Sequence, residues 1–369
     1  MIFYCETRMF SGQERMFLTG ACYISRKEKS VLLINENNKD GIAFAESEGS
    51  FNEIKLLADF NEMFSSVVVW FRWKKILSLY KFFLNKKETV CVSQGRIESG
   101  NIGIIAAKLA NVKTISYIPM VHSHREMGGD SLVSTIKDFL CKPLYHLPDS
   151  YITISDAVKQ ELSKKCNVYI HVVENFIQQQ QINQINEPPP LFDEDGYFKI
   201  VVPGRLQNKQ KGQLDFINAF DRIRDKINKP VVCYFVGNGP DFDLLQNKVE
   251  NTKLNNIIFL LGNRNDLLNI MMGSNLVVLP SRFEGVPLVL LEAASLNATI
   301  LASNIIGFNN YLPAECLFET RDIDSLASKL IEKINNKNAT MIEYNKSLID
   351  LIRRNKKEFT DDFYNALFS

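Results

Sequence analysis

Short apolar runs alternate with segments of helical periodicity along almost the whole chain, which is the pattern of βαβ units around a buried parallel sheet. In the first half, the strand-like runs are Ile2–Cys5, Val31–Asn35, Val90–Ser93, Thr114–Ile118, Tyr151–Ser155 and Tyr169–Val173. In the second half, they are Lys199–Val202, Val231–Val236, Ile257–Leu260, Leu276–Leu279 and Thr299–Ala302. The intervals predict helices, among them Asn101–Leu109, Asp156–Lys164 and helices that open near Gly212, Asp241, Asp266 and Pro287. The pattern therefore predicts two α/β domains, each built on a doubly wound sheet.

A polar, stiff segment separates the two predicted domains. Gln178–Pro190 contains a run of glutamines and ends in consecutive prolines, a composition that does not suit a packed element. We expect a first domain over residues 1–177, a linker over 178–197 and a second domain over 198–349. The last helix, about residues 350–369, is a candidate to pack back on the first domain.

Charge and cysteine usage narrow the class of protein. Lysine plus arginine (43) and aspartate plus glutamate (42) nearly cancel over 369 residues, so no overall charge favours nucleic acid as a partner. The cysteines are Cys5, Cys22, Cys91, Cys141, Cys166, Cys233 and Cys316. None of them forms a Cys-x-x-Cys pair, which argues against a zinc site and favours reduced, buried thiols.

The chain shows no signal for export or for spanning a membrane. Its first residues enter a strand-like run directly, and no apolar run reaches the roughly 18 residues that a transmembrane helix needs. We therefore expect a cytoplasmic protein.

Two cations follow the first strand of the second domain. Gly204-Arg205 comes directly after this strand, and Lys211-Gly212 precedes the next helix. Open α/β sheets bind ligands at the carboxyl ends of their strands, where a guanidinium and an ammonium together can neutralise a diphosphate. If only these two residues are considered, the alternative that they are solvated loop charges has equal weight.

The loop after a later strand of the same domain predicts an anion site. Gly285 lets a ligand approach the backbone, and Pro287 opens a helix whose first N–H groups, around Leu288 and Val289, can bind a phosphate. Glu292 lies in the otherwise apolar run Val286–Leu296, where a buried carboxylate needs a partner. That partner is either the diol of a ribose or a structural neighbour.

Several motifs together resemble those of family 4 glycosyltransferases of the GT-B fold. The motifs are Glu284-x7-Glu292, Arg205-x5-Lys211, the turn Phe235–Pro240 and the strand end Phe259–Gly262. Ser11–Arg15 is similar to the first glycine loop of the family, and Val172–Ile177 to the segment that joins its domains. The resemblance implies a GT-B fold, in which two Rossmann-like domains face a cleft, the first binding the acceptor and the second the nucleotide sugar.

The resemblance also assigns roles to single residues. Arg205 and Lys211 are expected to bind the donor diphosphate and to stabilise the charge of the leaving nucleotide. Glu284 is expected to hold hydroxyls of the donor sugar, and Glu292 the ribose. Residues expected to line the donor are Gly12, Gly204, Gly262, Asn263, Arg264, Gly285, Val286, Pro287, Leu288 and Val289. The resemblance implies that the enzyme retains the anomeric configuration and needs no metal, so we expect no metal site and no cofactor beyond the sugar donor.

One loop of the first domain contains two of the histidines. His122 and His124 follow a predicted strand, and a histidine of this loop contacts the donor sugar in similar enzymes. The resemblance favours His122 over His124 as an active-site residue. The other interpretation, that both are ordinary polar loop residues, stays open.

A basic and aromatic segment lies between Ser65 and Lys87, which encloses no acidic residue. Its cations include Arg72, Lys74, Lys75 and Lys81, with Trp73 and other aromatic residues between them. Such a helix either lies on the anionic inner face of the plasma membrane or is an ordinary core helix with a solvated basic side. The two interpretations have equal weight.

These observations predict a retaining hexosyltransferase. We expect it to move a hexose from a nucleotide-diphosphate sugar to a glycan or glycolipid acceptor, such as a polyprenyl-linked or other envelope glycan. A sugar-nucleotide epimerase or a phosphorylase would share the same two domains. A subunit that binds a sugar nucleotide without catalysis is the alternative from another class.

Overall fold

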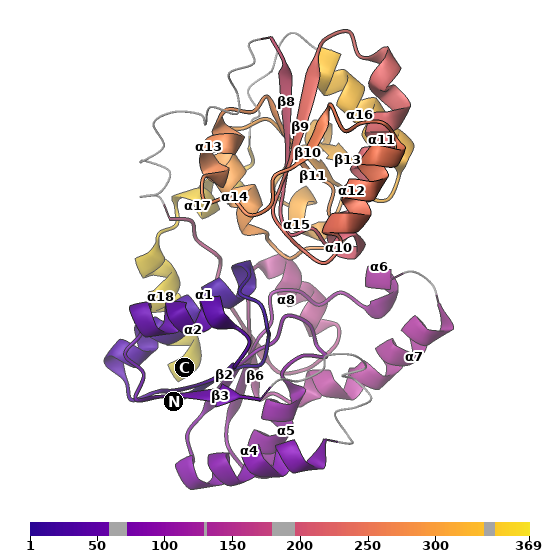
Figure 1. Cartoon of the computed structure of the whole chain (residues 1–369). Coiled ribbons are helices and arrows are strands. Elements are labelled where there is room, and N and C mark those ends of the chain that lie inside the picture. Colours follow the sequence, from indigo (N-terminus) through magenta and orange to yellow (C-terminus); the bar gives the residue numbers. More distant parts are fainter. Residues whose placement is uncertain (59–71, 129–130, 179–195, 336–343) are drawn as a thin grey trace. The chain divides into compact units, whose positions relative to one another are not determined.

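The computed structural model describes residues 1–58, 72–128, 131–178, 196–335 and 344–369. The chain divides into two compact units (Figure 1). Unit 1 comprises Met1–Asn175 together with Lys356–Ser369, and unit 2 comprises Phe176–Asn355. Most of the predicted linker, residues 179–195, lies outside the described residues.

Among the described residues of unit 1, seven strands form one parallel sheet. They are β1 (Ile2–Cys5), β2 (Val31–Asn35), β3 (Glu53–Leu57), β4 (Val90–Ser93), β5 (Thr114–Tyr117), β6 (Ser150–Thr153) and β7 (Tyr169–Val172). Their order is β3-β2-β1-β4-β5-β6-β7. Strand β3 was not predicted, because its mostly exposed residues do not form a buried apolar run.

Helices cover both faces of this sheet (Figure 1). They are α1 (Gly12–Lys27), α2 (Lys39–Glu48), α4 (Trp73–Lys86), α5 (Asn101–Leu109), α6 (His124–Gly128), α7 (Leu132–Cys141), α8 (Asp156–Ser163) and α18 (Lys356–Phe368). Side chains alternate along each strand, so Ile2 and Tyr4 pack in the core beneath α4 and α5. On the other face, Phe3 contacts Phe17 of α1, and Phe17 contacts Phe363 of α18.

Unit 2 has a second parallel sheet with a similar order. Its described strands are β8 (Phe198–Pro203), β9 (Val231–Val236), β10 (Ile258–Leu260), β11 (Leu276–Leu279), β12 (Ile300–Ser303) and β13 (Leu317–Phe318). They lie in the order β10-β9-β8-β11-β12-β13. The helices are α10 (Asn208–Lys211), α11 (Gln213–Ile223), α12 (Phe242–Asn251), α13 (Leu267–Met272), α14 (Leu288–Ser295), α15 (Ile306–Asn309), α16 (Ile323–Asn335) and α17 (Lys346–Arg353).

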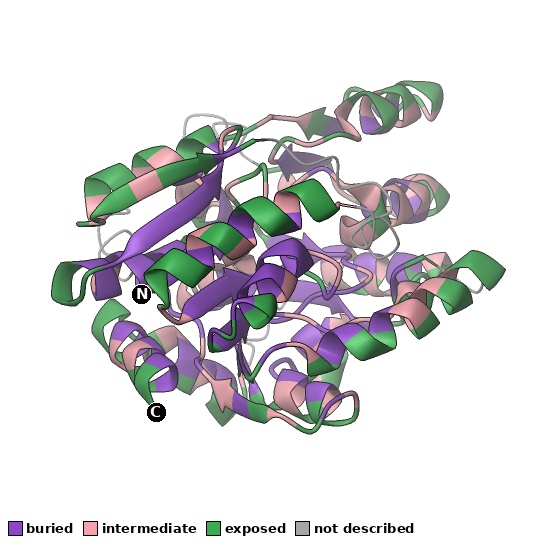
Figure 2. Cartoon of the chain, turned by 90° about the horizontal axis from the view of Figure 1, so that it is seen from below, coloured by how far each residue is buried: buried purple, intermediate pink, exposed green. Residues whose placement is uncertain are grey.

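Each sheet is covered on both faces, as buried parallel strands require. In unit 2, helices α11, α12 and α16 lie on one side and α13, α14 and α17 on the other (Figure 1). The strands are mainly buried, while the helices expose their outer sides (Figure 2). The predicted pair of doubly wound α/β domains is confirmed.

The strand order fixes where a ligand can bind in each unit. It reverses direction between β1 and β4 in unit 1 and between β8 and β11 in unit 2. Loops that leave the carboxyl ends of these strand pairs run to opposite faces of the sheet, which leaves a crevice for a ligand. The predicted cations and carboxylates of the second domain follow β8 and β11.

Candidate functional site

Residues that follow β8 and β11 meet at the reversal point of the sheet in unit 2. Arg205 lies just beyond β8, and Glu284 lies in the loop beyond β11. Lys211 ends the short helix α10 and places its Nζ 2.6 Å from Oε1 of Glu284. Their side chains are only 17% and 9% exposed, so the ion pair is largely withdrawn from water.

A glycine brings these two loops together. Gly212 joins α10 to α11 with a left-handed backbone (φ 64°). A Cβ at this position would lie 2.1 Å from the carbonyl oxygen of Pro280, the residue that follows β11. Only glycine allows this approach, so Gly212 sets the distance between Lys211 and the loop of Glu284.

The Arg205 backbone and side chain are both held locally. Its guanidinium donates to the side-chain oxygen of Gln207, and its carbonyl oxygen accepts from the Gln213 amide at 2.9 Å. A Cβ on Gly204 would lie 3.6 Å from Nζ of Lys211. The Lys211 ammonium therefore lies beside the backbone that carries Arg205, and the two cations share one edge of the sheet.

An ion pair that the sequence did not predict anchors the same loop. Arg282 donates from Nε to Oδ2 of Asp215 at 3.0 Å and from Nη2 to Oδ1 at 2.8 Å. Asp215 lies in the first turn of α11, and the backbone N–H of Arg282 donates to the Gln210 carbonyl oxygen at 2.7 Å. Paired bonds of this kind fix orientation as well as distance, so the loop that carries Glu284 is pre-positioned.

Helix α14 presents its N-terminus at the same edge. Pro287 is the N-cap residue rather than the first helical residue, and its side chain accepts no hydrogen bond. The N–H groups of Leu288 and Val289, in the first turn, have no acceptor within the helix. Gly285 and Val286 are buried just before this turn, and a Cβ on Gly307 would lie 2.1 Å from the Gly285 carbonyl oxygen.

Glu292 is less enclosed than its apolar surroundings indicated. It lies one turn further along α14 and is half-buried, because it points away from the side of the helix that packs Leu291 and Ala293. The carboxylate is therefore only partly buried, and its predicted role at the ribose stays a prediction.

Three of the residues predicted to line the donor, Gly262, Asn263 and Arg264, lie beyond β10. Gly262 has a left-handed backbone (φ 67°), and its carbonyl oxygen accepts from the Gly237 N–H at 2.8 Å, which joins the ends of β9 and β10. Asn263 and Arg264 are exposed. Hydrogen bonds from Arg264 lower the pKa of Asp266, the N-cap residue of α13, so this arginine is tied to its own loop.

In unit 1, Gly12 is the first residue of α1 rather than part of a free loop. The preceding Ser11 forms a capping box with Glu14, whose Oε2 accepts from the Ser11 N–H at 3.1 Å. Helix α1 begins beyond β1, at the reversal point of the unit 1 sheet. The role predicted for Gly12 in donor binding stays a prediction.

The two loop histidines have different surroundings. His124 begins α6 and lies 3.3 Å from Glu98 and 3.8 Å from the sulfur of Cys141. His122 is half-buried two residues earlier, near Glu126, whose pKa burial would raise but hydrogen bonds from Ser123 hold below its usual value. His124 thus belongs to a cluster in unit 1, and the active-site role predicted for His122 stays a prediction.

The described part of the basic segment forms α4. Its buried residues Ile76, Leu79 and Phe83 pack on the sheet, as the core interpretation expects. The opposite side exposes Trp73 and Lys74 together with Leu77, Lys81 and Leu84, and Arg72 and Lys75 lie at its margin. Residues 65–71 lie outside the described residues. Within the described ranges, no helix is both long and apolar enough to span a membrane.

The chain matches known glycosyltransferases in sequence and in fold. Residues 183–349 match the family model described as "Glycosyl transferases group 1". This match covers less than half of the chain, and together with the two doubly wound sheets it makes the chain similar to glycosyltransferases of the GT-B fold. The resemblance found in the sequence is confirmed at this level, while the assignment to family 4 stays a prediction.

Particular relatives narrow the comparison. The UDP-Gal:alpha-D-GlcNAc-diphosphoundecaprenol alpha-1,3-galactosyltransferase of Escherichia coli is 29% identical over 284 residues, covering 72% of this chain and 71% of that protein. The structure of Anabaena Alr3699/HepE in complex with UDP and glucose is 14% identical and has a TM-score of 0.73, covering 99% of this chain and 98% of that one. The lipopolysaccharide outer core galactosyltransferase WaaB is 18% identical and has a TM-score of 0.66, covering 100% and 98%.

Proposed function

We propose that the chain is a retaining, metal-independent family 4 enzyme that transfers a hexose from a UDP-sugar to a lipid-linked glycan. The observation that carries this proposal is the Lys211–Glu284 pair at the reversal point of the unit 2 sheet, beside the N-terminus of α14. A cation and free N–H groups suit a diphosphate, and a carboxylate next to them suits the hydroxyls of the attached sugar.

In this proposal, the chemistry of unit 2 is electrostatic. Negative charge grows on the diphosphate as the bond to the sugar breaks, and Arg205 and Lys211 stabilise it from a position held by Gly212 and Arg282. Because the site is preorganised and partly dry, little reorganisation is needed in the transition state. Glu292, further along α14, binds the ribose. The role of His122, which lies in unit 1, stays a prediction.

The donor and acceptor classes rest on the Escherichia coli relative, whose name gives UDP-galactose as donor and a diphosphoundecaprenol-linked sugar as acceptor. UDP-galactose is accordingly the first donor to test. A lipid-linked acceptor would place the enzyme at the inner face of the plasma membrane.

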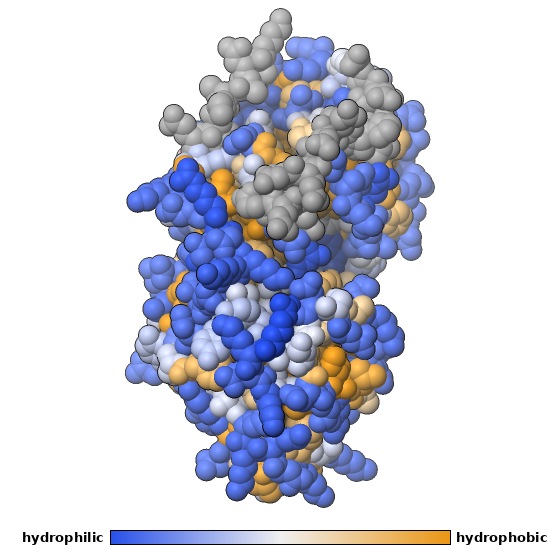
Figure 3. All heavy atoms as spheres, turned by 90° about the vertical axis from the view of Figure 1, so that its left-hand side faces the viewer, coloured by the Kyte–Doolittle hydropathy of each residue, from blue (hydrophilic) through white to orange (hydrophobic). Residues whose placement is uncertain are grey.

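Two helices of unit 1 support contact with a membrane surface. Helix α7 exposes a row of large apolar side chains, Leu132, Val133, Ile136 and Phe139, of which Leu132 is 78% and Phe139 69% exposed. Helix α4 exposes Trp73 beside basic residues. The face drawn in Figure 3 is mainly hydrophilic, with scattered hydrophobic patches. Apolar side chains next to lysines suit an anionic interface.

A donor panel tests the proposal. UDP-galactose, UDP-glucose, UDP-N-acetylglucosamine and GDP-mannose are each added while the thermal midpoint is measured, since a ligand that binds the native state raises it. The preferred donor is then incubated with a short-chain lipid diphosphate sugar, and the product's anomeric configuration is determined by NMR. We expect stabilisation by a UDP-sugar and an α-linked product. Stabilisation by GDP-mannose alone, or a β-linked product, contradicts the proposal.

A further inference from the structure

Three side chains of different chemistry converge beyond the carboxyl ends of β4 and β5 in unit 1. Glu98 lies in the loop between β4 and α5, His124 begins α6, and Cys141 ends α7. One potential ligand atom from each lies within 4.8 Å of the other two. His124 and Glu98 are 12% and 14% exposed, and Cys141 is buried. The group is therefore built into the fold rather than scattered over its surface.

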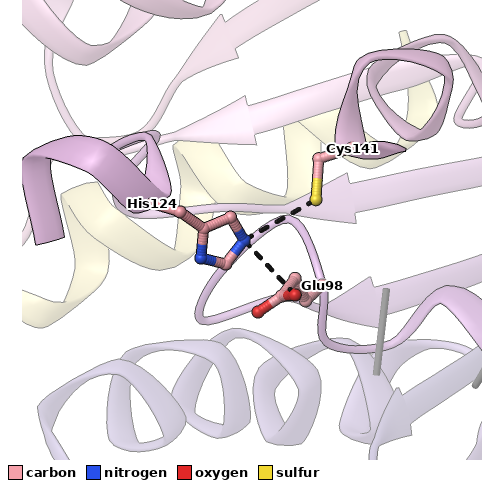
Figure 4. A group of neighbouring side chains, drawn as sticks. All are labelled: Glu98, His124 and Cys141. Atoms are coloured by element: carbon pink, nitrogen blue, oxygen red, sulfur yellow. Dashed lines mark hydrogen bonds and ion pairs between the residues drawn. The ribbon is translucent and has the colours of Figure 1, made fainter. Parts of the chain in front are cut away.

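A single ring nitrogen makes both contacts. Nε2 of His124 lies 3.3 Å from Oε1 of Glu98 and 3.8 Å from Sγ of Cys141 (Figure 4). A protonated Nε2 can donate to the carboxylate but cannot accept from the thiol, and an unprotonated Nε2 has the opposite limitation. A protonated Nε2 can share its proton with the thiol sulfur only weakly, so neither state gives two strong hydrogen bonds. A hydrogen-bonded triad of the catalytic type would instead use the two ring nitrogens separately.

A metal ion satisfies all three groups at once. Tetrahedral Zn²⁺ with bonds of about 2.0–2.3 Å to nitrogen, oxygen and sulfur keeps its ligand atoms roughly 3.3–3.6 Å apart. The two observed distances, 3.3 and 3.8 Å, lie close to this range. A set with one imidazole, one carboxylate and one thiolate suits Zn²⁺ or a similar transition metal rather than Mg²⁺ or Ca²⁺.

We propose that Glu98, His124 and Cys141 form a binding site for Zn²⁺ or a chemically similar divalent transition metal. The thiol loses its proton to solvent as the sulfur–metal bond forms, and water completes the coordination. The resemblance to family 4 enzymes implied no metal, and these three residues form no short ligand motif that would have indicated one.

The surroundings support a positioned ligand set. Oδ1 of Asp138 in α7 accepts from the His124 backbone N–H at 2.6 Å, which ties the start of α6 to α7.

The site joins three segments that are distant in the sequence. A metal bound there would fix the loop that ends at His124 to the Glu98 loop and to α7. His122 lies two residues before His124 on that loop, so the metal would position it without touching a substrate. The role is structural and is separate from the electrostatic chemistry assigned to unit 2.

Cobalt binding tests the site directly, because thiolate-bound Co²⁺ gives an intense charge-transfer absorption. The full chain, stripped of metal with a chelator and kept reduced, is titrated with Co²⁺ and then with Zn²⁺. We expect this band to saturate at one equivalent and to disappear as Zn²⁺ replaces Co²⁺. Cys141→Ser should abolish the band, while Cys166→Ser, at a buried cysteine of the same core cluster, should keep it.

His124→Gln provides a second variant in case Cys141→Ser does not fold. It should weaken Zn²⁺ binding by more than the roughly 10–100-fold that changes to outer ligand contacts cause. Absence of the band in the wild-type chain overturns the proposal. An equal band in Cys141→Ser, or unchanged Zn²⁺ affinity in His124→Gln, does the same.

Discussion

Lys211 and Glu284 hold each other in place across 2.6 Å, with little solvent to weaken the interaction. In the proposed reaction, removal of the lysine takes away a cation close to the diphosphate, where negative charge grows during transfer. We predict that Lys211→Ala and Arg205→Ala each lower turnover by on the order of a hundredfold. Lys209→Ala, at an exposed lysine in the same helix, should leave turnover unchanged. Steady-state rates with the preferred donor measure the effect.

A matching loss in Lys209→Ala would mean that the charge of α10 as a whole matters, rather than two positioned cations. Near-wild-type rates in both Lys211→Ala and Arg205→Ala would refute the assignment of these residues to catalysis.

The two carboxylates of the motif should differ in what they bind. We predict that Glu292→Gln weakens binding of free UDP by roughly 1–3 kcal/mol, because an amide replaces a charged acceptor at the ribose. Glu284→Gln should keep UDP binding but reduce transfer, because its contacts require the sugar. Calorimetry with bare UDP separates the two, and Glu315→Gln, at an exposed glutamate, is the control. Equal losses of UDP affinity in both variants would contradict the assignment of the two glutamates to separate subsites.

The site residues that were predicted from the sequence belong to short motifs. The residues that hold these motifs in position were not predicted. Arg205, Lys211 and Glu284 could be found because glycines and strand ends mark their positions. The Arg282–Asp215 pair joins residues 67 positions apart and lies outside those motifs. The Glu98, His124 and Cys141 group depends on three separate loop and helix ends, which sequence spacing does not bring together.

At the scale of elements, Gly212 and Gly262 have nearly the same left-handed backbone, with φ values of 64° and 67°. They differ in the room that is available for a side chain. A Cβ added at Gly212 would clash with the Pro280 carbonyl oxygen, whereas a Cβ added at Gly262 would have no atom within 4 Å. We predict that Gly262→Ala destabilises the fold by about 1–2 kcal/mol from backbone strain alone. Gly212→Ala should cost at least about 1 kcal/mol more.

Chemical denaturation of both variants tests this difference. Equal losses of stability would show that the α10–α11 turn can move away from the Pro280 loop without cost. The distance between Lys211 and Glu284 would then not depend on Gly212.

Helices α7 and α4 should act together at a lipid surface. We predict that Leu132→Ser with Ile136→Ser and Phe139→Ser weakens binding to anionic vesicles at least tenfold, because each large apolar side chain contributes about 1.5–3 kcal/mol when buried. Lys74→Glu with Lys81→Glu should remove the salt-sensitive part of vesicle binding, because each basic residue near an anionic surface contributes about 1 kcal/mol.

Vesicle flotation at low and high salt measures both effects. Leu244→Ser removes an exposed leucine from α12 in unit 2 and is the matched control. Equal binding of the wild-type chain to neutral and anionic vesicles, or no binding to either, would exclude the proposed surface.

Element prediction succeeded for the buried central strands and for the partly exposed β7 and β10, and it missed β3 and the two-residue β13. The central strands of both sheets are continuous apolar runs, so their positions follow from the sequence. The edge strand β3 exposes most of its residues, and only its pairing with β2 makes it a strand. Its place in the sheet is a tertiary effect that local pattern does not contain.

For the molecule as a whole, the return of α18 to unit 1 joins the two ends of the described chain. Phe363 is fully buried, with its ring centroid 6.5 Å from Phe17 and 6.1 Å from Tyr117. We predict that Phe363→Ala destabilises unit 1 by about 3–5 kcal/mol. Phe368→Ala, at an exposed ring of the same helix, should change stability by no more than about 0.5 kcal/mol.

Scanning calorimetry of the two variants measures the unfolding temperature of each unit, where the two units unfold in separate transitions. A fall in the transition of unit 2 but not of unit 1 would contradict the assignment of α18.

Because α18 belongs to unit 1, the two units cannot finish folding in the order in which they are synthesised. A ribosome completes residues 1–175 first, yet the face of the unit 1 sheet beneath Phe363 stays uncovered until α18 emerges. All of unit 2 is made in between, at roughly 5–20 residues per second. Unit 2 is a continuous stretch and can fold as it appears, whereas unit 1 must wait with apolar surface exposed. Nascent unit 1, rather than unit 2, is therefore the natural client of chaperones during translation.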